Sequence, residues 1–569
     1  MDISALIKVA RGEEPAELLL KNARVVNVFS GEIEETSIAI MQSGIVGLGD
    51  YPAQRVIDLE GHYVAPGFID AHLHIESSMV PPFEFAHAVV AHGTTTVVID
   101  PHEIANVLGA EGIRYMLEAS KYTPFSVYMM LPSSVPATPL ETNGATLRWP
   151  DLLDFKDNPW VLGLGEMMNY AGVLRRDQAV LDKLRAFTGC RIDGHAPGLT
   201  GRDLEGYVAV GIGSDHESTT VEEAREKLRL GMYVMIREAS NAHNLKTLLP
   251  LITPKNARRI LFVSDDRFPD DLIDQGHIDF MVHTAIREGL DPIIAIQIAT
   301  LNAAEYFGLR DRGAIAPGHR ADLVVFDNFE NFKIEQVYQG GRLVARNGRI
   351  LPQAQSPNHP PVRNSINVNW SKVDVRLPAN GHRRVRVIEL IPNQITTHQS
   401  VDEARIENGH AVADPSRDLS KIAVIERHKA TGNVGLGFVR GFKLKRGAIG
   451  SSVAHESHNI IVAGANDDDL MTAARAIAAM EGGMIAVADG QVLARLPLPI
   501  AGLMSDQSIE RVREGMDKLV EATRDLGTDL HAPFMALAFL ALPVIPELKL
   551  TDRGLVDVNQ FDFVSVFAD

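Results

Sequence analysis

Cysteine is almost absent from this sequence of 569 residues, which contains only Cys190. A disulfide within the chain and a zinc site built from several thiolates are both excluded as a result. A single thiol suits a reducing compartment, and we predict a cytoplasmic location. Apolar runs are also short, because none approaches the roughly 18 residues that a membrane-spanning helix needs. The first residues, 1–14, lack the apolar core of a signal peptide.

Positive charge is in short supply too. The chain has 55 Lys and Arg against 73 Asp and Glu, which gives a formal net charge of -18. Such a surface repels phosphate backbones, so we expect no nucleic-acid polymer as a partner, and a small neutral or cationic ligand remains possible. Hydrophobic residues make up 45% of the sequence, as in ordinary globular proteins, and the length exceeds what one core supports.

The sequence divides into four stretches. Short alternating strands punctuated by Gly and Asn occupy 1–60 and return at 311–350, and we expect these two pieces to form one discontinuous small β-sandwich. Residues 351–379 are rich in proline and are predicted to be a linker. Residues 380–569 mix strand-like and helical runs, which predicts a C-terminal α+β domain.

The central stretch, 61–310, alternates apolar strands with segments of helical size. This pattern is typical of an α/β fold of the TIM-like (β/α)8 barrel type, in which the chemistry lies at the carboxyl ends of the strands. The predicted strands are Val64–Ile75, Thr94–Asp100, Ser126–Leu131, Val161–Glu166, Arg191–His195, Gly211–His216, Met232–Arg237 and Arg259–Asp265.

Polar residues gather at these strand ends. His72 and His74 are two residues apart, and because side chains alternate along a strand, both imidazoles face the same side. Further histidines and carboxylates follow later strands, at His195, His216 and Glu166 among others. Four imidazoles and two carboxylates are more than one ion requires, whereas two ions that share a carboxylate and a hydroxide would satisfy them.

Two segments resemble signatures of the amidohydrolase superfamily: Pro66–His74 and Gly313–Val324. This resemblance implies a metal-dependent hydrolase barrel. Within the superfamily, further segments are similar to those of the bacterial adenine deaminases, and they extend over essentially the whole chain. They are His74–Met79, Asp100–Ile104, Gly165–Met168, Asp193–His195, His216–Ser218, Met235–Glu238, Ser264–Arg267, His455–Ile460 and Leu496–Met504.

The resemblance implies two divalent metal ions, with manganese or iron favoured and zinc possible. Glu166 would bridge the two ions, and Asp265 would also accept a proton from the bridging hydroxide. Asp266 is a second candidate for the place of Asp265. The implied ligands are His72, His74, Glu166, His195, His216 and Asp265.

The implied reaction is hydrolytic deamination of free adenine to hypoxanthine and ammonia in purine salvage, with the metal-bridged hydroxide attacking C6. Attack at C6 requires a proton donor at N1, and we predict Glu238 for this role, with Arg237 as an orienting group. His455 and His458 lie outside the barrel, and they are either surface residues or residues that close over the substrate. Other predicted contacts to substrate or ligands are His102, Glu103 and Asp266.

Two other functions are compatible with the same fold. One is hydrolysis of a cyclic amide or N-acyl substrate, and the other is a non-catalytic assembly scaffold. The nucleobase deaminases whose zinc is held by a Pro-Cys-x-x-Cys motif are excluded, because the chain has one cysteine. We further expect a homo-oligomer, a dimer or larger, with the C-terminal domain as a lid over the barrel mouth.

Overall fold

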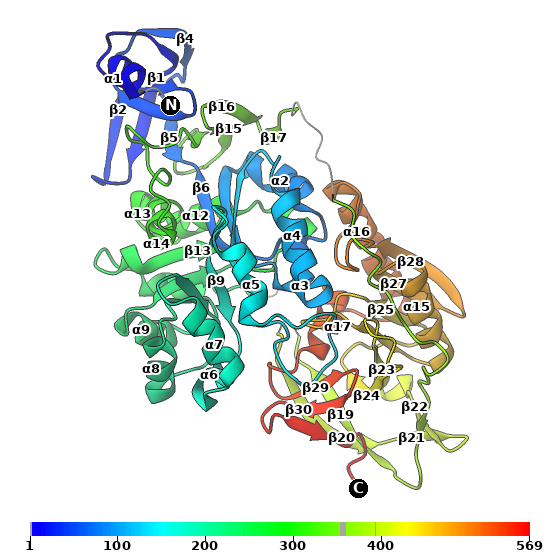
Figure 1. The fold of residues 1–569 in the computed structure, drawn as a ribbon. Coiled ribbons are helices and arrows are strands. Elements are labelled where there is room, and N and C mark those ends of the chain that lie inside the picture. Colours follow the sequence, from blue (N-terminus) through cyan, green and yellow to red (C-terminus); the bar gives the residue numbers. More distant parts are fainter. Residues whose placement is uncertain (1–2, 241, 353–359, 393) are drawn as a thin grey trace.

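The structure is a computed structural model that describes residues 3–240, 242–352, 360–392 and 394–569. Part of the expected linker, residues 353–359, lies outside the described residues. Figure 1 shows a sheet at the N-terminal end, a central body of parallel strands wrapped by helices, and a C-terminal body of mixed strands and helices. No helix in the described part of the chain is both long and apolar enough to cross a membrane.

The N-terminal sheet is assembled from the two ends of the first 350 residues. Its strand order is β17-β16-β15-β14-β5-β1-β2-β3, and β4 pairs with β1. The antiparallel pair of β5 with β14 joins the early and late segments into one nine-stranded sheet. The strands are β1 (Ala16–Asn27), β2 (Glu32–Met41), β3 (Gly44–Leu48), β4 (Ala53–Asp58), β5 (Tyr63–Pro66), β14 (Leu323–Phe326), β15 (Ile334–Gln339), β16 (Arg342–Arg346) and β17 (Arg349–Ile350), and α1 (Ile3–Ala10) precedes them.

The predicted strand Val64–Ile75 is wrong as a single element. The chain breaks at Gly67 into β5, in the N-terminal sheet, and β6 (Phe68–Leu73), in the central body. The Gly67 N–H leaves the strand pattern and donates to the Asp322 carbonyl at 2.8 Å. A side chain at this position would lie 2.1 Å from Thr95 Oγ1, so only glycine fits where the two sheets meet.

Eight strands in the predicted order build the central body. They form two parallel ladders, β10-β9-β8-β7-β6 and β11-β12-β13, rather than one closed barrel. A parallel bridge between Leu73 and Asp265 links the ladders at one side, and Gly213 N–H donates to the Ile192 carbonyl at the other. The strands after β6 are β7 (Thr94–Ile99), β8 (Ser126–Leu131), β9 (Val161–Met167), β10 (Arg191–Gly194), β11 (Ser214–Asp215), β12 (Tyr233–Arg237) and β13 (Ile260–Val263).

The ladder is interrupted beside β11 because this strand has only two residues, and so it cannot continue a regular ladder with β10. Helices cover the outside of the strands (Figure 1). They are α2 (Pro82–Val89), α3 (His102–Leu108), α4 (Ala110–Ala119), α5 (Trp149–Lys156), α6 (Tyr170–Arg175), α7 (Gln178–Ala186), α8 (Gly201–Ala209), α9 (Val221–Arg229), α10 (Leu245–Leu248), α11 (Pro269–Asp274), α12 (Ile278–Arg287), α13 (Pro292–Ile298) and α14 (Leu301–Phe307).

The C-terminal body is built on an eight-stranded sheet of order β20-β19-β24-β23-β26-β25-β27-β28. Its strands are β19 (Arg384–Leu390), β20 (Thr397–Glu403), β23 (Ser420–Ile425), β24 (Val434–Arg440), β25 (Ala448–Ser451), β26 (Ile460–Gly464), β27 (Gly483–Ala488) and β28 (Gln491–Pro497). The remaining elements are α15 (Asp467–Ala479), α16 (Ile509–Leu526), α17 (Pro533–Ala538) and two small sheets, β18 (Leu377–Pro378) with β21 (Arg405–Glu407) and β22 (His410–Val412), and β29 (Leu548–Thr551) with β30 (Gly554–Asp557) and β31 (Asp562–Val564).

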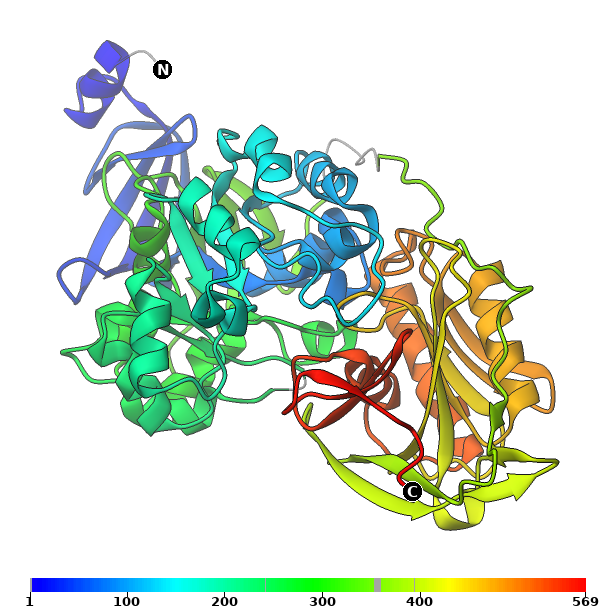
Figure 2. The same cartoon turned by 60° about the horizontal axis from the view of Figure 1, so that its bottom comes forward.

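The loop between β8 and α5 fastens the C-terminal body to the carboxyl ends of the central strands. Asn459 donates to the Thr142 carbonyl at 2.7 Å, and Thr142 N–H donates to Asp552 at 2.8 Å. Thr551 donates to the Leu140 carbonyl at 2.8 Å. Figure 2 shows the red strands β29–β31 between the central body and the eight-stranded sheet. The C-terminal body is therefore held over the edge where the polar strand ends converge.

Candidate metal centre

The structure brings together the predicted metal-ligating residues. His72 lies in β6, His74 just past it and Glu166 in β9. His195 and His216 directly follow β10 and β11, and Asp265 lies two residues past the end of β13. Subsets of these side chains place donor atoms within 4.8 Å of one another, namely His72 with His74 and Glu166, His72 with His216 and Asp265, and Glu166 with His195 and His216.

Glu166 lies between two groups of imidazoles. Its Oε1 is 3.2 Å from His74 Nε2 and 3.7 Å from His72 Nε2. Its Oε2 accepts from His195 Nδ1 at 2.7 Å and lies 3.3 Å from His216 Nε2. Burial alone would raise the pKa of Glu166, but the His195, His216 and His74 imidazoles hold it well below its usual value. An ionised carboxylate with one oxygen toward each group is the geometry expected of a bridging ligand.

The donor set fits divalent cations. His72 Nε2 is buried and has no hydrogen-bond partner among the described residues, although three other imidazoles lie nearby. Burial, followed by the neighbouring His216, lowers the pKa of His72 well below its usual value, so the ring stays neutral with a lone pair available. Nitrogen and oxygen donors without sulfur suit manganese, iron or zinc, and the geometry alone does not select among them.

Asp265 is better placed than Asp266 to join the first group of proposed ligands, His72 and His74. Its Oδ1 is 3.2 Å from His74 Nε2, and its Oδ2 accepts from Arg237 at 2.8 Å. Burial would raise the pKa of Asp265, but His74 and Arg237 hold it well below its usual value. Asp266 instead accepts from Ser77 Oγ at 2.5 Å, and burial together with Asp265 raises its pKa to about 6. The two neighbours therefore have different environments, and Asp265 stays ionised to a lower pH than Asp266.

Asp70 and His277 stabilise the backbone that carries His72 and Asp265. The Asp70 carboxylate accepts from the backbone N–H of His72 and of Ser264, each at 3.2 Å, so it ties the first and last central strands together. Its other oxygen lies 2.9 Å from His277 Nε2. All of these groups are buried. This contact fixes the backbone that carries the ligands, as partners behind a metal site usually do.

Asp215 and Lys227 stabilise the second group of proposed ligands, His195 and His216. Asp215 accepts from the Ala196 N–H at 2.9 Å and from Lys227 Nζ at 2.7 Å, and Lys227 also donates to the Ala196 carbonyl at 2.8 Å. The Lys227 side chain is fully buried. Because Ala196 follows His195 and Asp215 precedes His216, this ion pair holds both imidazoles in position.

Glu238 does not reach the cavity that these ligands line. Its carboxylate accepts from His243 Nδ1 at 2.9 Å and from the Leu245 N–H at 3.1 Å. The sequence analysis missed Glu217, which does line the cavity. Both terminal guanidinium nitrogens of Arg237 donate to its carboxylate, one of them at 3.1 Å. The signal was present, because Glu217 belongs to the His216–Ser218 segment noted for its resemblance.

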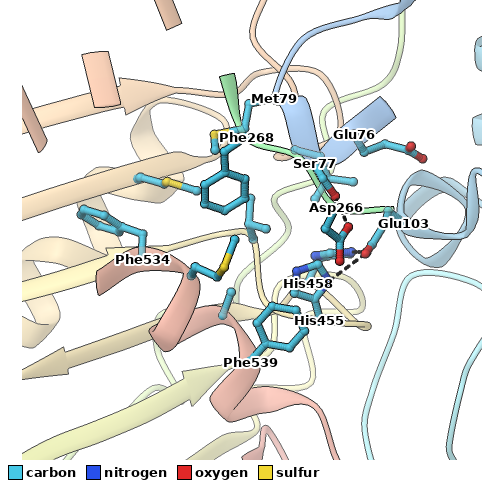
Figure 3. Close-up of a pocket in the computed structure, with 15 residues that line it drawn as sticks. Glu76, Ser77, Met79, Glu103, Asp266, Phe268, His455, His458, Phe534 and Phe539 are labelled. Carbon is cyan, nitrogen blue, oxygen red and sulfur yellow. Dashed lines mark hydrogen bonds and ion pairs between the residues drawn. The ribbon is translucent and has the colours of Figure 1, made fainter. Parts of the chain in front are cut away.

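The C-terminal histidines contact the central body directly, on the two oxygens of Glu103. His455 Nδ1 donates to Oε1 at 2.7 Å, and His458 Nε2 donates to Oε2. Burial opposes charge on His455, but Glu103 raises its pKa to about 9. His458 Nδ1 accepts from the Ala454 N–H at 3.2 Å, so the ring carries its proton on Nε2. Nε2 is the nitrogen that faces Glu103, and a protonated nitrogen cannot bind a metal ion. These three residues thus form a clamp between the two bodies (Figure 3), referred to below as the Glu103 clamp.

His102 links this clamp to the ligands. Its Nε2 is 2.8 Å from Glu456, a second residue that the sequence analysis did not select, and its Nδ1 is 3.4 Å from Glu166. The cavity itself is small and partly open to solvent. The ligands line one side, and the C-terminal body supplies an apolar wall on the other: Ile395, Phe539, Leu542 and Ile545.

Comparisons with known proteins agree with this arrangement. A family model described as the amidohydrolase family matches residues 63–344, and one described as the adenine deaminase C-terminal domain matches residues 394–562. An adenine deaminase of Desulfatibacillum aliphaticivorans is 52% identical over 564 residues, 99% of each chain. The chain belongs to the adenine deaminase family of the amidohydrolase superfamily.

A second member of that family, from Carboxydothermus hydrogenoformans and named adenine deaminase 2, is 51% identical over 566 residues and likewise covers 99% of each chain. Among solved structures, a beta-aspartyl dipeptidase of Fervidobacterium islandicum covers 60% of this chain and 99% of its own, at 16% identity and a TM-score of 0.45. The sequence similarity to the two deaminases extends over the central and C-terminal bodies together.

Proposed function

We propose that this chain hydrolyses free adenine to hypoxanthine and ammonia. The main support is that four imidazoles and two carboxylates converge at one buried site. The chain is also 52% identical over its length to an adenine deaminase. The small-molecule partner is then a purine base. A cytoplasmic location and a homo-oligomeric state, a dimer or larger, remain predictions.

Two divalent ions, manganese or iron, are the cofactors that we propose. His72, His74 and Asp265 would hold one ion, and His195 and His216 the other. Glu166 faces both groups and would bridge the ions. When bound, such ions lower the pKa of water and so supply hydroxide at neutral pH.

Asp265 and Glu217 are the groups that we assign to proton transfer. Glu217 is 3.4 Å from His216 Nε2 and takes the place that we predicted for Glu238. Glu217 lines the cavity in a position fixed by Arg237, and we assign it to receive the first proton of the attacking water and deliver it to N1. Asp265 then receives the second proton from the new hydroxyl at C6 and gives it to the amine. The C6–N bond breaks, ammonia leaves, and the product carries a carbonyl at C6 and hydrogen at N1.

The finer architecture is also part of the proposal. The two parallel ladders would together constitute a (β/α)8 barrel of residues 61–310. The segments 1–60 and 311–350 form the composite β-sandwich, and 351–379 connect to a C-terminal domain of residues 380–569. Support comes from the nine-stranded sheet that joins the early and late segments and from the hydrogen bonds between the two ladders.

The test is ammonia release from adenine by protein purified from manganese-supplemented, iron-limited culture. Adenosine and a cyclic amide serve as control substrates, and elemental analysis gives the metal content of the same sample. Rapid release from adenine alone is expected. A sample with two metals per chain that leaves adenine intact would refute the assignment, and turnover of the cyclic amide would then identify an amide hydrolase.

A further inference from the structure

A further group of buried polar atoms lies beside the proposed bridging ligand. Asp100 and His102 follow β7 at the carboxyl edge of the central strands, and both side chains are buried. His102 Nδ1 lies 3.4 Å from Glu166 Oε1 and 3.6 Å from Asp100 Oδ1. Neither of the two ion positions proposed above uses Asp100 or His102.

Two atoms of this group have no hydrogen-bond partner among the described residues, namely Asp100 Oδ1 and His102 Nδ1. Their separation of 3.6 Å is too long for a direct hydrogen bond. The other carboxylate oxygen of Asp100 accepts from the Glu166 N–H at 3.0 Å, which fixes the Asp100 side chain beside Glu166. Because a buried polar atom without a partner is costly, a bound cation would satisfy both atoms at once.

The C-terminal body orients the His102 ring. His102 Nε2 lies 2.8 Å from the Glu456 carboxylate, and an ionised carboxylate only accepts hydrogen bonds, so the ring carries a proton on Nε2. In the neutral ring the lone pair is then on Nδ1, the nitrogen that faces Asp100 and Glu166. Metal-binding histidines commonly donate their second nitrogen to a carboxylate in this way. His102 thus differs from His458, whose Nδ1 lone pair accepts from a backbone N–H.

The surroundings of His102 favour positive charge at this place. Burial opposes charge on the ring, but Glu456 raises its pKa well above the usual value, and Asp100 and Glu103 act in the same direction. A proton on Nδ1 would leave both neighbouring carboxylate oxygens beyond the usual hydrogen-bond distance. One metal ion between the three atoms would contact all of them.

The spacing of the three atoms also fits one ion. Ligand atoms that lie about 2.1 Å from the same ion are about 3.0–3.5 Å apart. In the first group of proposed ligands, His74 Nε2 and His72 Nε2 lie 3.2 and 3.9 Å from Asp265 Oδ1. The distances from His102 Nδ1 fall within this range.

We infer that Asp100, His102 and Glu166 form a third binding position for a divalent cation, with Glu456 as the carboxylate that orients His102. One imidazole and two carboxylates suit manganese, iron or zinc. The position shares only Glu166 with the two ions of the proposed function. The C-terminal body would then take part in metal binding through Glu456.

The experiment counts bound ions. Apoprotein is titrated with Mn²⁺ up to about 1 mM free ion, and the free concentration is read from the electron paramagnetic resonance signal of Mn²⁺. We expect three bound ions per chain in the native protein and two in His102→Leu. Two ions per chain in the native protein would overturn the inference, and so would three in His102→Leu.

A matched pair of variants tests the orienting role of Glu456. Glu456→Leu removes the acceptor for His102 Nε2 and should weaken binding of the third ion by about 10–100-fold while the other two bind as before. Glu141→Leu makes the same change at another buried carboxyl group whose pKa Glu456 helps to raise, and it should bind all three ions as the native protein does. Equal weakening in the two variants would refute the orienting role.

Ammonia release from adenine, measured on the same samples, separates this inference from the proposed function. Native protein that binds two ions and turns over adenine would support the proposed function and overturn the third position. Native protein that binds three ions, loses one in His102→Leu and leaves adenine intact would do the reverse.

Discussion

Replacing Glu103 with glutamine should open the contact between the two bodies. Glu103 is buried and holds His455 and His458 on its two oxygens. It raises the pKa of His455 from 6.5 to about 9, which corresponds to about 3 kcal/mol at 1.36 kcal/mol per pH unit. Loss of one partner of a buried ion pair costs about 3–5 kcal/mol, so the two approaches agree in size.

Hydrogen exchange is the suitable assay, because a chain of several bodies need not unfold in one step. Amides in peptides that span 454–464 should lose protection by roughly 100-fold in Glu103→Gln at pH 7, since 1.4 kcal/mol is a factor of ten. Glu118→Gln is the matched control, because its carboxylate is 54% exposed in a surface pair with Lys121. We expect less than about 1 kcal/mol there.

The pH dependence of the same protection has a definite sign. The folded-state pKa of His455 lies above its unfolded value, so its contribution is complete below about pH 6.5 and is lost as the pH rises through about 9. After correction for intrinsic exchange, the native protein should lose protection over this window and Glu103→Gln should not. Equal protection in Glu103→Gln and Glu118→Gln would show that the Glu103 clamp does not hold the bodies together.

Four further substitutions test the metal centre. Glu217→Gln should lower kcat/KM for adenine by about 10²–10⁴, whereas Glu238→Gln should leave it nearly unchanged; the reverse order would return the N1 role to Glu238. Glu166→Ala should reduce bound metal, measured by elemental analysis, and abolish ammonia release, and full metal content in this variant would contradict the bridging role. Lys227→Met leaves Asp215 buried without its cation and should cost about 3–5 kcal/mol, seen as a lower melting temperature and loss of metal from the His195 and His216 side.

Much of this architecture could be predicted from the order of residues along the chain. Apolar runs of strand length separated by helical segments gave the central strands, and in parallel strands the carboxyl ends lie at one edge. For that reason His195 and Glu166, 29 residues apart, were expected to meet, and they do. The proposed metal ligands are determined by their position at the ends of the central strands, which a single sequence displays directly.

Glu217 shows where local reasoning stops. It lies in the His216–Ser218 segment noted for its resemblance, but nothing in the sequence shows that its side chain faces the cavity. The strand β11 ends at Asp215, so the residues after it follow a loop held by Asp215 and Lys227, and no two-residue period applies to them. The break at Gly67 has the same origin, because it depends on Asp322 and Thr95, which are distant in sequence.

The role of the C-terminal body depends on contacts that no local pattern contains. Its segments wall the metal cavity through Ile395 and Phe539, and Lys549 donates to the backbone carbonyls of both, at 2.7 and 3.1 Å. Burial lowers the pKa of Lys549 to about 7, since these carbonyls replace water without supplying a countercharge. A wall fixed in this way excludes water from the reacting atoms and strengthens the electrostatic contacts of Asp265 and Glu217. The central body alone would leave these groups open to solvent, which is a physical reason for this chain to carry both bodies.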